Sequence, residues 1–277
     1  MNKIFSNSPC LLGKTKDSQT CFDIESLKMM ANELKKNNLI DKKYKINNKS
    51  KKQLWNLIRE SFANKCKNKE DCWLEQGPIS KLNNEKIHLK TFRPKFPDEW
   101  KENKYEWLSS VDILNVMKQL EEGDNQFTFL GPVPSDCPAK INCELSKLDP
   151  IKLSKQGINK IGIVYNLDVS TGPGTHWTAV FINTPKNEID YFDSYGDKPT
   201  WLIQKFMEKM GKKFLKHNRE PFLIYNDKRK QYGNSECGMY SMYFLIKRLL
   251  GDSMYKISQE KITDRKMNNL RKILYRK

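Results

Sequence analysis

The chain has 277 residues, enough for one large domain or two modest ones, and its 38% of hydrophobic and 30% of charged residues are typical of a globular protein. No apolar run approaches the ~18 residues of a membrane-spanning helix, which excludes a membrane span. The net charge of +17 indicates either an anionic partner, such as nucleic acid, or a Lys-rich composition without functional meaning.

Much of this excess charge lies in the first third of the chain. Residues 1–94 hold 20 Lys and Arg against 10 Asp and Glu. Apolar residues at helical spacing predict two amphipathic helices there, at residues 22–37 and 50–65. The segment TFRPKFPDEW, with its two prolines, reads as a connector. We therefore expect a basic, mainly helical N-terminal region over residues 1–94 and a second domain over residues 95–277.

The second domain is expected to contain both helices and strands. Ser109 or Ser110 can cap a helix that ends at Gly123, and a short strand follows in FTFLGPVPSDCP. Apolar runs rich in β-branched and aromatic residues predict strands at 160–169, 176–183, 188–195 and 221–227. Helical spacing predicts further helices at 200–215, from residue 237 to about 250, and at the basic C-terminus. Strands in the middle with helices at both ends indicate an α+β fold.

The cysteines argue for a reducing environment and against a metal centre. Seven cysteines are spread along the chain, and the first residues lack the long apolar core of a secretion signal. We therefore expect an intracellular, reducing compartment. Cys66 and Cys72, like Cys137 and Cys143, are separated by five residues, which is wrong for a zinc knuckle, and the chain has only three histidines. No metal and no cofactor is expected.

Cys237 lies where a polar, glycine-containing loop gives way to an apolar helical segment, in QYGNSECGMYSMYF. A cysteine at a helix N-terminus is exposed to backbone N–H groups and to the positive end of the helix dipole, which favour the nucleophilic thiolate. A buried structural cysteine is the alternative, because free cysteines are often part of the core. A nucleophile also needs a base and a residue that orients the base.

His176 and Asp193 can supply this base and its partner. His176 begins the strand at 176–183, and Asp193 follows the next apolar run in YFDSYG. If these two strands form a hairpin, the two residues lie at neighbouring strand ends. The carboxylate can then accept from one imidazole nitrogen while the other nitrogen faces the thiol. Gln231, six residues before Cys237, has an amide donor that can stabilise an oxyanion together with the Cys237 N–H.

The chain order His, Asp, Gln, Cys resembles the ubiquitin-like-protein-specific cysteine proteases. This family includes the SUMO-deconjugating enzymes, the adenovirus endopeptidase and the polyprotein protease of African swine fever virus. The resemblance covers about residues 95–277 and rests on the motifs GTHWTAVF, YFDSYG and QYGNSECGMYSMYF. It implies a papain-like core with a central mixed sheet flanked by helices. It also implies that His176 is the base, Asp193 its orienting partner, Gln231 the oxyanion donor and Cys237 the nucleophile.

The resemblance extends to two tryptophans. In such enzymes one Trp before the first core helix and one after the catalytic His flank a narrow tunnel that admits Gly-Gly, and here these positions are Trp107 and Trp177. Two facing indole rings leave room for backbone but exclude a Cβ. Structural burial of both rings is the alternative. Ser110 replaces the acidic residue that deconjugating enzymes carry at this position, which weakens the case for a ubiquitin-like substrate.

The sequence therefore predicts a cysteine endopeptidase with a Cys–His–Asp triad. The composition and the additional N-terminal region resemble most the members of this protease family from large DNA viruses. Those members cut structural polyprotein precursors after Gly-Gly-type sites during virion maturation. One alternative is an isopeptidase that removes SUMO or ubiquitin. A second is a nucleic-acid-binding protein on a protease scaffold, with contacts made by the basic N-terminal region. The expected locations are the host cytoplasm or viral factory, and the virion.

Overall fold

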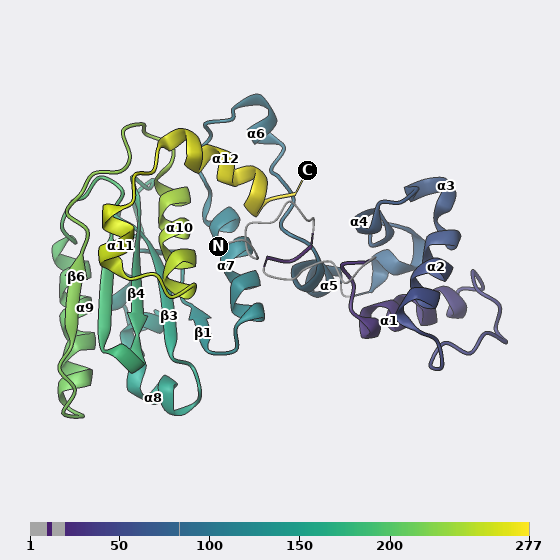
Figure 1. Ribbon diagram of the computed structural model, residues 1–277, viewed down its shortest axis with the longest axis horizontal. Helices are drawn as coiled ribbons and strands as arrows, with labels where there is room; N and C mark the ends of the chain where they lie inside the picture. Colours follow the sequence, from purple (N-terminus) through teal and green to yellow (C-terminus); the bar gives the residue numbers. More distant parts are fainter. Residues whose placement is uncertain (1–9, 13–19, 83, 277) are drawn as a thin grey trace. The chain divides into compact units, whose positions relative to one another are not determined.

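A computed structural model describes residues 10–12, 20–82 and 84–276 of the chain (Figure 1). The chain divides into two compact units, one bounded by Met1–Lys95 together with Ile273–Lys277, and the other by Phe96–Lys272. This division lies close to the boundary expected at residue 94, whereas the last five residues, expected in the second domain, belong to the first unit. Periodicity within a segment carries no information on which distant segment the chain end contacts, so the sequence could not show this return.

The first unit is built from short helices around one apolar cluster. Ser50 begins a helix with a capping box, in which its side chain accepts from the Gln53 N–H and the Gln53 side chain accepts from the Ser50 N–H. Phe22 and Trp73, both fully buried, stack on each other within this cluster. The predicted helix at 50–65 is interrupted at Phe62. The helices are α1 (Ile24–Lys36), α2 (Lys51–Ser61), α3 (Ala63–Cys66), α4 (Glu70–Trp73) and α5 (Asn84–Thr91).

The second unit contains a mixed sheet with the strand order β1-β3-β4-β5-β6, and β2 pairs with β3 beside β1. The pairs β3–β4 and β4–β5 are antiparallel, whereas β1, β2 and β6 pair in parallel with their neighbours. The strands are β1 (Phe127–Phe129), β2 (Val133–Pro134), β3 (Lys160–Asn166), β4 (Trp177–Asn183), β5 (Glu188–Phe192) and β6 (Phe222–Tyr225). The central strands β3, β4 and β5 are almost continuously buried because both faces of the sheet are covered.

Helices cover the sheet on both faces. Alternate residues of the central strands, among them Ile163 and Val180, form a core cluster with Phe206 and Met210 of one helix, α9 (Trp201–Leu215). On the other face, α10 (Cys237–Leu249) packs on β4, and Phe244 stacks on Phe192. Figure 1 shows α10 in front of the sheet and α9 behind it. The other helices are α6 (Glu99–Glu102), α7 (Ser110–Gly123), α8 (Pro150–Lys155), α11 (Met254–Gln259) and α12 (Asp264–Leu274). The α+β prediction is confirmed, with the expected mixed sheet between helices.

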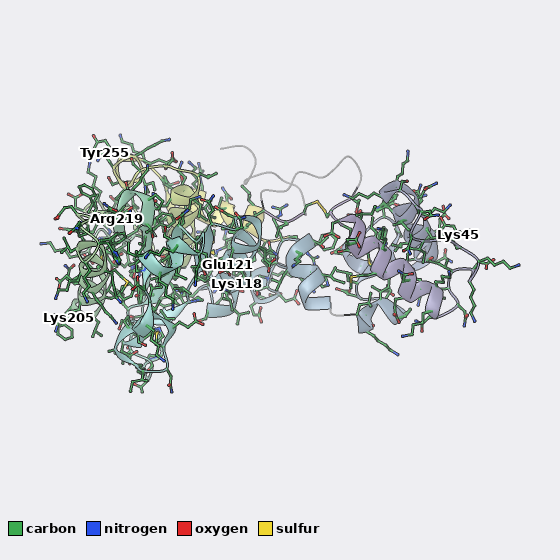
Figure 2. All side chains as sticks on the ribbon, turned by 90° about the horizontal axis from the view of Figure 1, so that it is seen from below. Lys45, Lys118, Glu121, Lys205, Arg219 and Tyr255 are labelled. Atoms are coloured by element: carbon green, nitrogen blue, oxygen red, sulfur yellow. A yellow bond between two sulfur atoms is a disulfide. The ribbon has the colours of Figure 1, made fainter. Side chains whose placement is uncertain are left out.

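The Glu121 carboxylate links α7 to β1, the first strand of the sheet, through hydrogen bonds. Glu121 accepts from the Phe129 N–H at 3.0 Å and from the Thr128 hydroxyl at 2.7 Å, and its other oxygen pairs with Lys118 at 2.6 Å. Figure 2 labels Lys118 and Glu121 among the side chains of the second unit. Of the two serines predicted as possible caps, Ser109 is the N-cap of this helix, as part of a capping box with Asp112. The start of α7 is therefore well defined, and it follows directly on the segment that carries Trp107.

Six of the seven cysteines form disulfides, which differs from the expectation of a reducing compartment. The pairs are Cys10–Cys21, Cys66–Cys72 and Cys137–Cys143. The Cα atoms of the last two pairs are 5.5 Å apart in each case. The five-residue spacing that argued against a zinc knuckle is therefore compatible with a disulfide loop. Cys237 is the free cysteine of the chain and is buried.

Candidate active site

Cys237 is the first residue of α10, as the sequence predicted. Glu236 stands at the N-cap position and makes no side-chain hydrogen bond to the first turn. The N–H groups and dipole of the helix are therefore directed at the thiol without a competing cap. Cys237 is only 2% exposed, yet it belongs to no disulfide. Cys237 is therefore a buried free thiol at a helix N-terminus.

His176 and Asp193 meet at the open end of the β4–β5 hairpin. His176 directly precedes β4, and Asp193 directly follows β5, in a register that pairs Ala179 with Phe192. The His176 Nε2 lies 2.8 Å from the Asp193 Oδ1. Nδ1 is then the imidazole nitrogen left to interact with Cys237, whose side chain hydrogen-bonds to the ring. The structure thus brings His176 together with Asp193, which lies 17 positions later in the sequence, and with Cys237, which lies 61 positions later.

The charge of His176 is controlled by its surroundings. Burial lowers the pKa of the imidazole, whereas its hydrogen bonds with Asp193 and Cys237, together with the negative charge of these two groups, raise it. The raising contributions dominate, and they bring the pKa of His176 to about 9. An imidazolium beside the sulfur is the partner that a cysteine nucleophile requires at neutral pH.

Asp193 is fixed by residues that the sequence analysis missed. Its Oδ1 also accepts from the Tyr195 N–H at 2.8 Å. The Asn226 amide accepts from the Asp193 N–H at 2.9 Å and donates to the Asp193 carbonyl at 2.8 Å. The Tyr195 ring stacks on the His176 ring with centroids 4.6 Å apart and an interplanar angle of 8°. Tyr195 stood in the quoted motif YFDSYG, but no local pattern pointed to Asn226.

Gln231 is fully buried and its amide is oriented from both ends. Its Oε1 accepts from the Ser194 hydroxyl at 2.7 Å, and its Nε2 donates to the Gly233 carbonyl at 3.0 Å. An amide nitrogen carries two hydrogens, so one remains for another acceptor. The hydrogen bond from Ser194 ensures that the nitrogen, and not the oxygen, is available. Gln231 can therefore serve as the donor that an oxyanion needs.

Trp177 and Trp107 differ in their surroundings. Trp177 is buried, and its indole N–H donates to the Leu108 carbonyl at 3.0 Å. A Cβ placed on Gly238 would lie 3.2 Å from both the Trp177 ring and the Leu108 side chain. Trp177 is thus packed against the residue that follows Cys237. Trp107, next to Leu108, is 44% exposed, so complete burial does not account for it.

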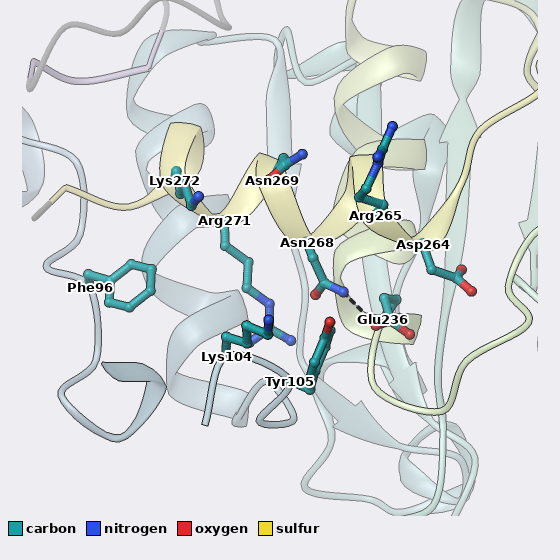
Figure 3. A pocket seen from close by; sticks show the side chains of 10 residues that line it. All are labelled: Phe96, Lys104, Tyr105, Glu236, Asp264, Arg265, Asn268, Asn269, Arg271 and Lys272. Carbon is teal, nitrogen blue, oxygen red and sulfur yellow. Dashed lines mark hydrogen bonds between the residues drawn. The ribbon is translucent and has the colours of Figure 1, made fainter. Parts of the chain in front are cut away.

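The loop before Cys237 is supported from α12. The Glu236 carboxylate accepts from the Ser235 hydroxyl and from the Asn268 amide, each at 2.7 Å. Figure 3 shows the Asn268–Glu236 hydrogen bond at the edge of a pocket of about 470 Å³. Asp264 accepts from the N–H groups of Tyr232 and Gly233 at 3.0 and 2.8 Å. These bonds hold the backbone immediately before the thiol.

The comparisons with known proteins agree with the geometry. The Ulp1 protease family, C-terminal catalytic domain, matches residues 163–277. The protein R355 of Acanthamoeba polyphaga mimivirus, which bears the name of a thiol protease, is 31% identical over 281 residues, spanning 94% of this chain and 90% of R355. The chain belongs to the Ulp1-like cysteine protease family. It is a cysteine-type peptidase, as the sequence predicted.

Further members of the Ulp1-like family are similar over part or all of the chain. A cysteine protease of African swine fever virus, from a tick isolate, is 35% identical over 128 residues, which is 45% of this chain and 47% of the viral protein. The chain thus matches about half the length of that relative. A crystal structure of the African swine fever virus protease superposes with a TM-score of 0.69 at 22% identity, covering 99% of this chain and 97% of that one. This likeness shows the same fold.

No membrane-spanning helix and no metal cluster is found in this Ulp1-like protease, within residues 10–12, 20–82 and 84–276. No helix in that part is long and apolar enough to cross a bilayer. No group of three or more His, Cys, Asp or Glu side chains there could hold a metal ion.

Proposed function

We propose that this Ulp1-like protease is an endopeptidase with Cys237 as nucleophile, His176 as acid and base, and Asp193 as the orienting residue. The proposal rests on one observation: the His176–Asp193 hydrogen bond of 2.8 Å leaves the second imidazole nitrogen to the free thiol at the N-terminus of α10. His176 and Asp193 are both buried, and each is held in place because it adjoins a paired strand of the β4–β5 hairpin. This arrangement satisfies the requirements of nucleophilic catalysis by cysteine.

The reaction proceeds by acyl transfer to sulfur. The Cys237 thiolate attacks the scissile carbonyl, and the developing oxyanion accepts hydrogen bonds from the Cys237 N–H and the Gln231 amide. His176 gives its Nδ1 proton to the leaving amine, which departs with the segment after the cut. Water then attacks the thioester, with His176 as base, and the carboxylate product leaves.

We further propose that the residues before the cut are Gly-Gly, in structural polyprotein precursors cut during virion maturation. Trp177 is immobilised by its hydrogen bond to the Leu108 carbonyl and lies against Gly238. Trp107, the residue directly before Leu108, is exposed. A slot bordered by indole rings admits glycine and excludes a side chain at that position. The precursor class follows from the resemblance to large-DNA-virus members.

A pair of peptides tests this proposal. A substrate ending in Gly-Gly before the cut should be cleaved faster than its Gly-Ala counterpart by about 5- to 150-fold, which corresponds to overpacking by one methyl group. Trp177→Ala should lower the overall rate and shrink this discrimination. Equal cleavage of both peptides by the wild type would overturn the Gly-Gly proposal and leave the triad proposal in place.

An isopeptidase is the second candidate. A relative from another isolate of African swine fever virus, 34% identical over 128 residues, bears the name SUMO-1 cysteine protease. Ser110, at the start of α7, stands where deconjugating enzymes carry an acidic residue, which favours the endopeptidase. Release of SUMO or ubiquitin from lysine conjugates, measured beside peptide cleavage, separates the two candidates.

Binding of nucleic acid by the basic N-terminal region stays a prediction that rests on charge alone. The excess of Lys and Arg over residues 1–94 supplies a general attraction to phosphates. If it serves binding, DNA affinity should fall steeply as salt rises, and removal of residues 1–94 should abolish it. Affinity independent of salt would contradict this interpretation.

A further inference from the structure

A stack of aromatic rings and one cation extends outward from the imidazole of His176. The Tyr195 ring lies parallel to the His176 ring at 4.6 Å. The guanidinium carbon of Arg229 lies 5.1 Å from the centre of the Tyr195 ring and 5.2 Å from the centre of the Tyr232 ring. Both rings thus contact the same cation. We call Tyr195, Arg229 and Tyr232 the aromatic–arginine stack.

The loop that carries Arg229 is fixed to the turn after Asp193. The N–H groups of Lys230 and Gln231 both donate to the Ser194 carbonyl, at 2.8 and 2.9 Å. Gly196 has a φ of +82°, and a Cβ placed there would lie 2.8 Å from the backbone nitrogen of Arg229. Only glycine allows the two backbones to approach this closely. The position of Arg229 is therefore set by the same turn that sets Asp193.

Arg229 differs from the two lysines beside it in what its side chain contacts. The Lys228 ammonium donates to a side-chain amide at 2.6 Å, and the buried Lys230 ammonium donates to two backbone carbonyls in the segment 258–260. Arg229 uses its Nε to bind the Gln231 carbonyl at 2.8 Å. Within the described ranges, no hydrogen bond or ion pair occupies its two terminal nitrogens. A held guanidinium with a free outer edge suits a carboxylate, which accepts two parallel N–H bonds.

The place of the stack in the cleft indicates which part of a substrate meets it. Under the proposed mechanism, His176 gives its proton to the leaving amine, so the segment after the cut passes the imidazole. Trp177 lies with the residues before the cut. An extended segment advances about 3.3 Å per residue. The first two residues after the cut, with their side chains, are therefore long enough to reach from the imidazole past the Tyr195 ring to Arg229.

We propose that the aromatic–arginine stack is a subsite for an acidic side chain at the first or second position after the cut bond. This inference rests on the proposed function and adds the chemistry of the leaving segment to it. The carboxylate pairs with the terminal nitrogens of Arg229, while the two rings keep the guanidinium in place. A lysine-rich leaving segment is repelled, which makes acidic junctions in a polyprotein better substrates than basic ones.

The test compares peptides that share one sequence up to Gly-Gly and then carry Glu, Gln or Lys at the first or second position. Glu and Gln have nearly the same shape, so their ratio of kcat/KM isolates the charge. We expect the wild type to prefer Glu over Gln by about 2- to 5-fold at low salt at one of the positions, and the preference to fall as salt rises. Lys should be the poorest of the three.

Two variants on the same loop separate a local subsite from general attraction. Arg229→Met should bring the Glu-to-Gln ratio close to one, and Arg229→Lys should restore part of it. Lys228→Met removes the same charge from the adjacent residue and should keep the wild-type ratio. Because each ratio is measured within one variant, any change in Gln231 that follows the loss of the Arg229 bond cancels.

Equal rates on Glu and Gln peptides at both positions would overturn the subsite, as would equal loss of the preference in Lys228→Met and Arg229→Met. Failure to cleave any Gly-Gly peptide would overturn the proposed function instead. In that case the subsite is tested by binding: the free leaving-segment peptides that begin with Glu should protect Cys237 from iodoacetamide better than those with Gln. Equal protection would overturn the inference. A short single-stranded oligonucleotide is the comparison ligand. If it protects Cys237 better than the Glu peptides do, and this protection is lost in Arg229→Met, the inference is overturned in favour of a nucleic-acid site.

Discussion

His176 is surrounded by groups that act on its charge in opposite directions. Burial lowers its pKa, whereas its hydrogen bonds with Asp193 and Cys237 raise it, and the result is a pKa of about 9. The ordinary value for histidine is 6.5. The imidazolium therefore persists through neutral pH, and it is the form that can protonate a leaving amine.

The first prediction concerns the pH dependence of cleavage. Activity that depends on imidazolium is present below pH 9 and is lost as the pH rises through about 9, so the basic limb of kcat/KM should lie there. Because the pKa is raised on folding, its contribution to stability is fully present below the unfolded value of 6.5 and is lost as the pH rises through about 9. In Asp193→Asn the raising charge is absent, and the basic limb should move to lower pH. An unmoved limb in the pH profile of this variant would contradict the assignment.

Asp193→Asn should be milder than His176→Ala. The Asn carbonyl can still accept from the imidazole and keep its orientation, while the charge that favours imidazolium is lost. Removal of the acid and base itself should cost about 10²- to 10⁴-fold in rate. We expect at least about 10-fold more residual activity in Asp193→Asn than in His176→Ala. Circular dichroism of both variants serves as the control for folding, and equal inactivity in folded protein would show that Asp193 does more than orient.

At the scale of elements, the site depends on where α10 meets the β4–β5 hairpin. The helix is buried along nearly its whole length, because its residues pack between the sheet and the following segments. Its first turn therefore lies at the strand ends that carry His176 and Asp193. Gly238, the second residue of the helix, permits close contact with Trp177 and Leu108. The N-terminus of α10 and the end of the hairpin that carries Trp177 therefore meet at this contact.

Gly238→Ala tests that contact. The new Cβ would lie 3.2 Å from two buried side chains, Trp177 and Leu108, that have little room to move. We expect overpacking to lower the free energy of unfolding by about 1–3 kcal/mol, partly offset by the better helix propensity of Ala. Gly-Gly cleavage should fall as Trp177 is displaced. Gly123→Ala, at the end of α7 with no atom within 4 Å, is the matched control and should be neutral or stabilising. Similar effects of both variants on activity would argue against the contact.

At the scale of the whole chain, the cysteines separate into structural pairs and one free thiol. Two disulfides belong to the first unit and one to the second. Cys237 takes part in none of them. The Cys237 thiol is therefore chemically distinct from the other cysteines.

Alkylation of the non-reduced, folded chain should modify Cys237 alone. After denaturation and reduction, all seven cysteines should react with iodoacetamide. Peptide mapping by mass spectrometry gives both results in one experiment. Labelling of Cys66 or Cys137 before reduction would show that those disulfides are not formed.

The return of the C-terminus to the first unit gives a second prediction at this scale. Arg276 pairs with Asp71 and donates to the Arg93 carbonyl, and Tyr275 is buried. Deletion of residues 273–277 removes these contacts and should destabilise the first unit by several kcal/mol, about 3–5 for a large buried side chain. Limited proteolysis within residues 20–95 should accelerate. Arg276→Ala, which keeps Tyr275, should have a smaller effect; unchanged proteolysis in the deletion would contradict the division into units.

Local patterns in the sequence were sufficient for the elements that carry the candidate triad. The apolar runs of β4 and β5, with NTPKN between them, predict a hairpin, and helical spacing from Cys237 onward predicts α10. These features depend on neighbours in the chain, so periodicity records them. The limits of the strands were less accurate, because the predicted strand at 160–169 ends at Asn166, where the loop towards His176 begins. Short helices such as α8 and α11 carry too few turns to show a period.

By itself, the sequence determined the α+β class, the chain order of His176, Asp193, Gln231 and Cys237, and the family to which they point. Only the tertiary structure decided what surrounds them: Asn226 lies 33 residues from Asp193 in the chain, and the disulfide partners and the C-terminal return are equally invisible to local patterns. The same holds for Arg229, which stood in the sequence as one cation among many. Charge and helical spacing are properties of a segment, whereas the free edge of a guanidinium held between two rings depends on contacts that form when the sheet and its loops come together.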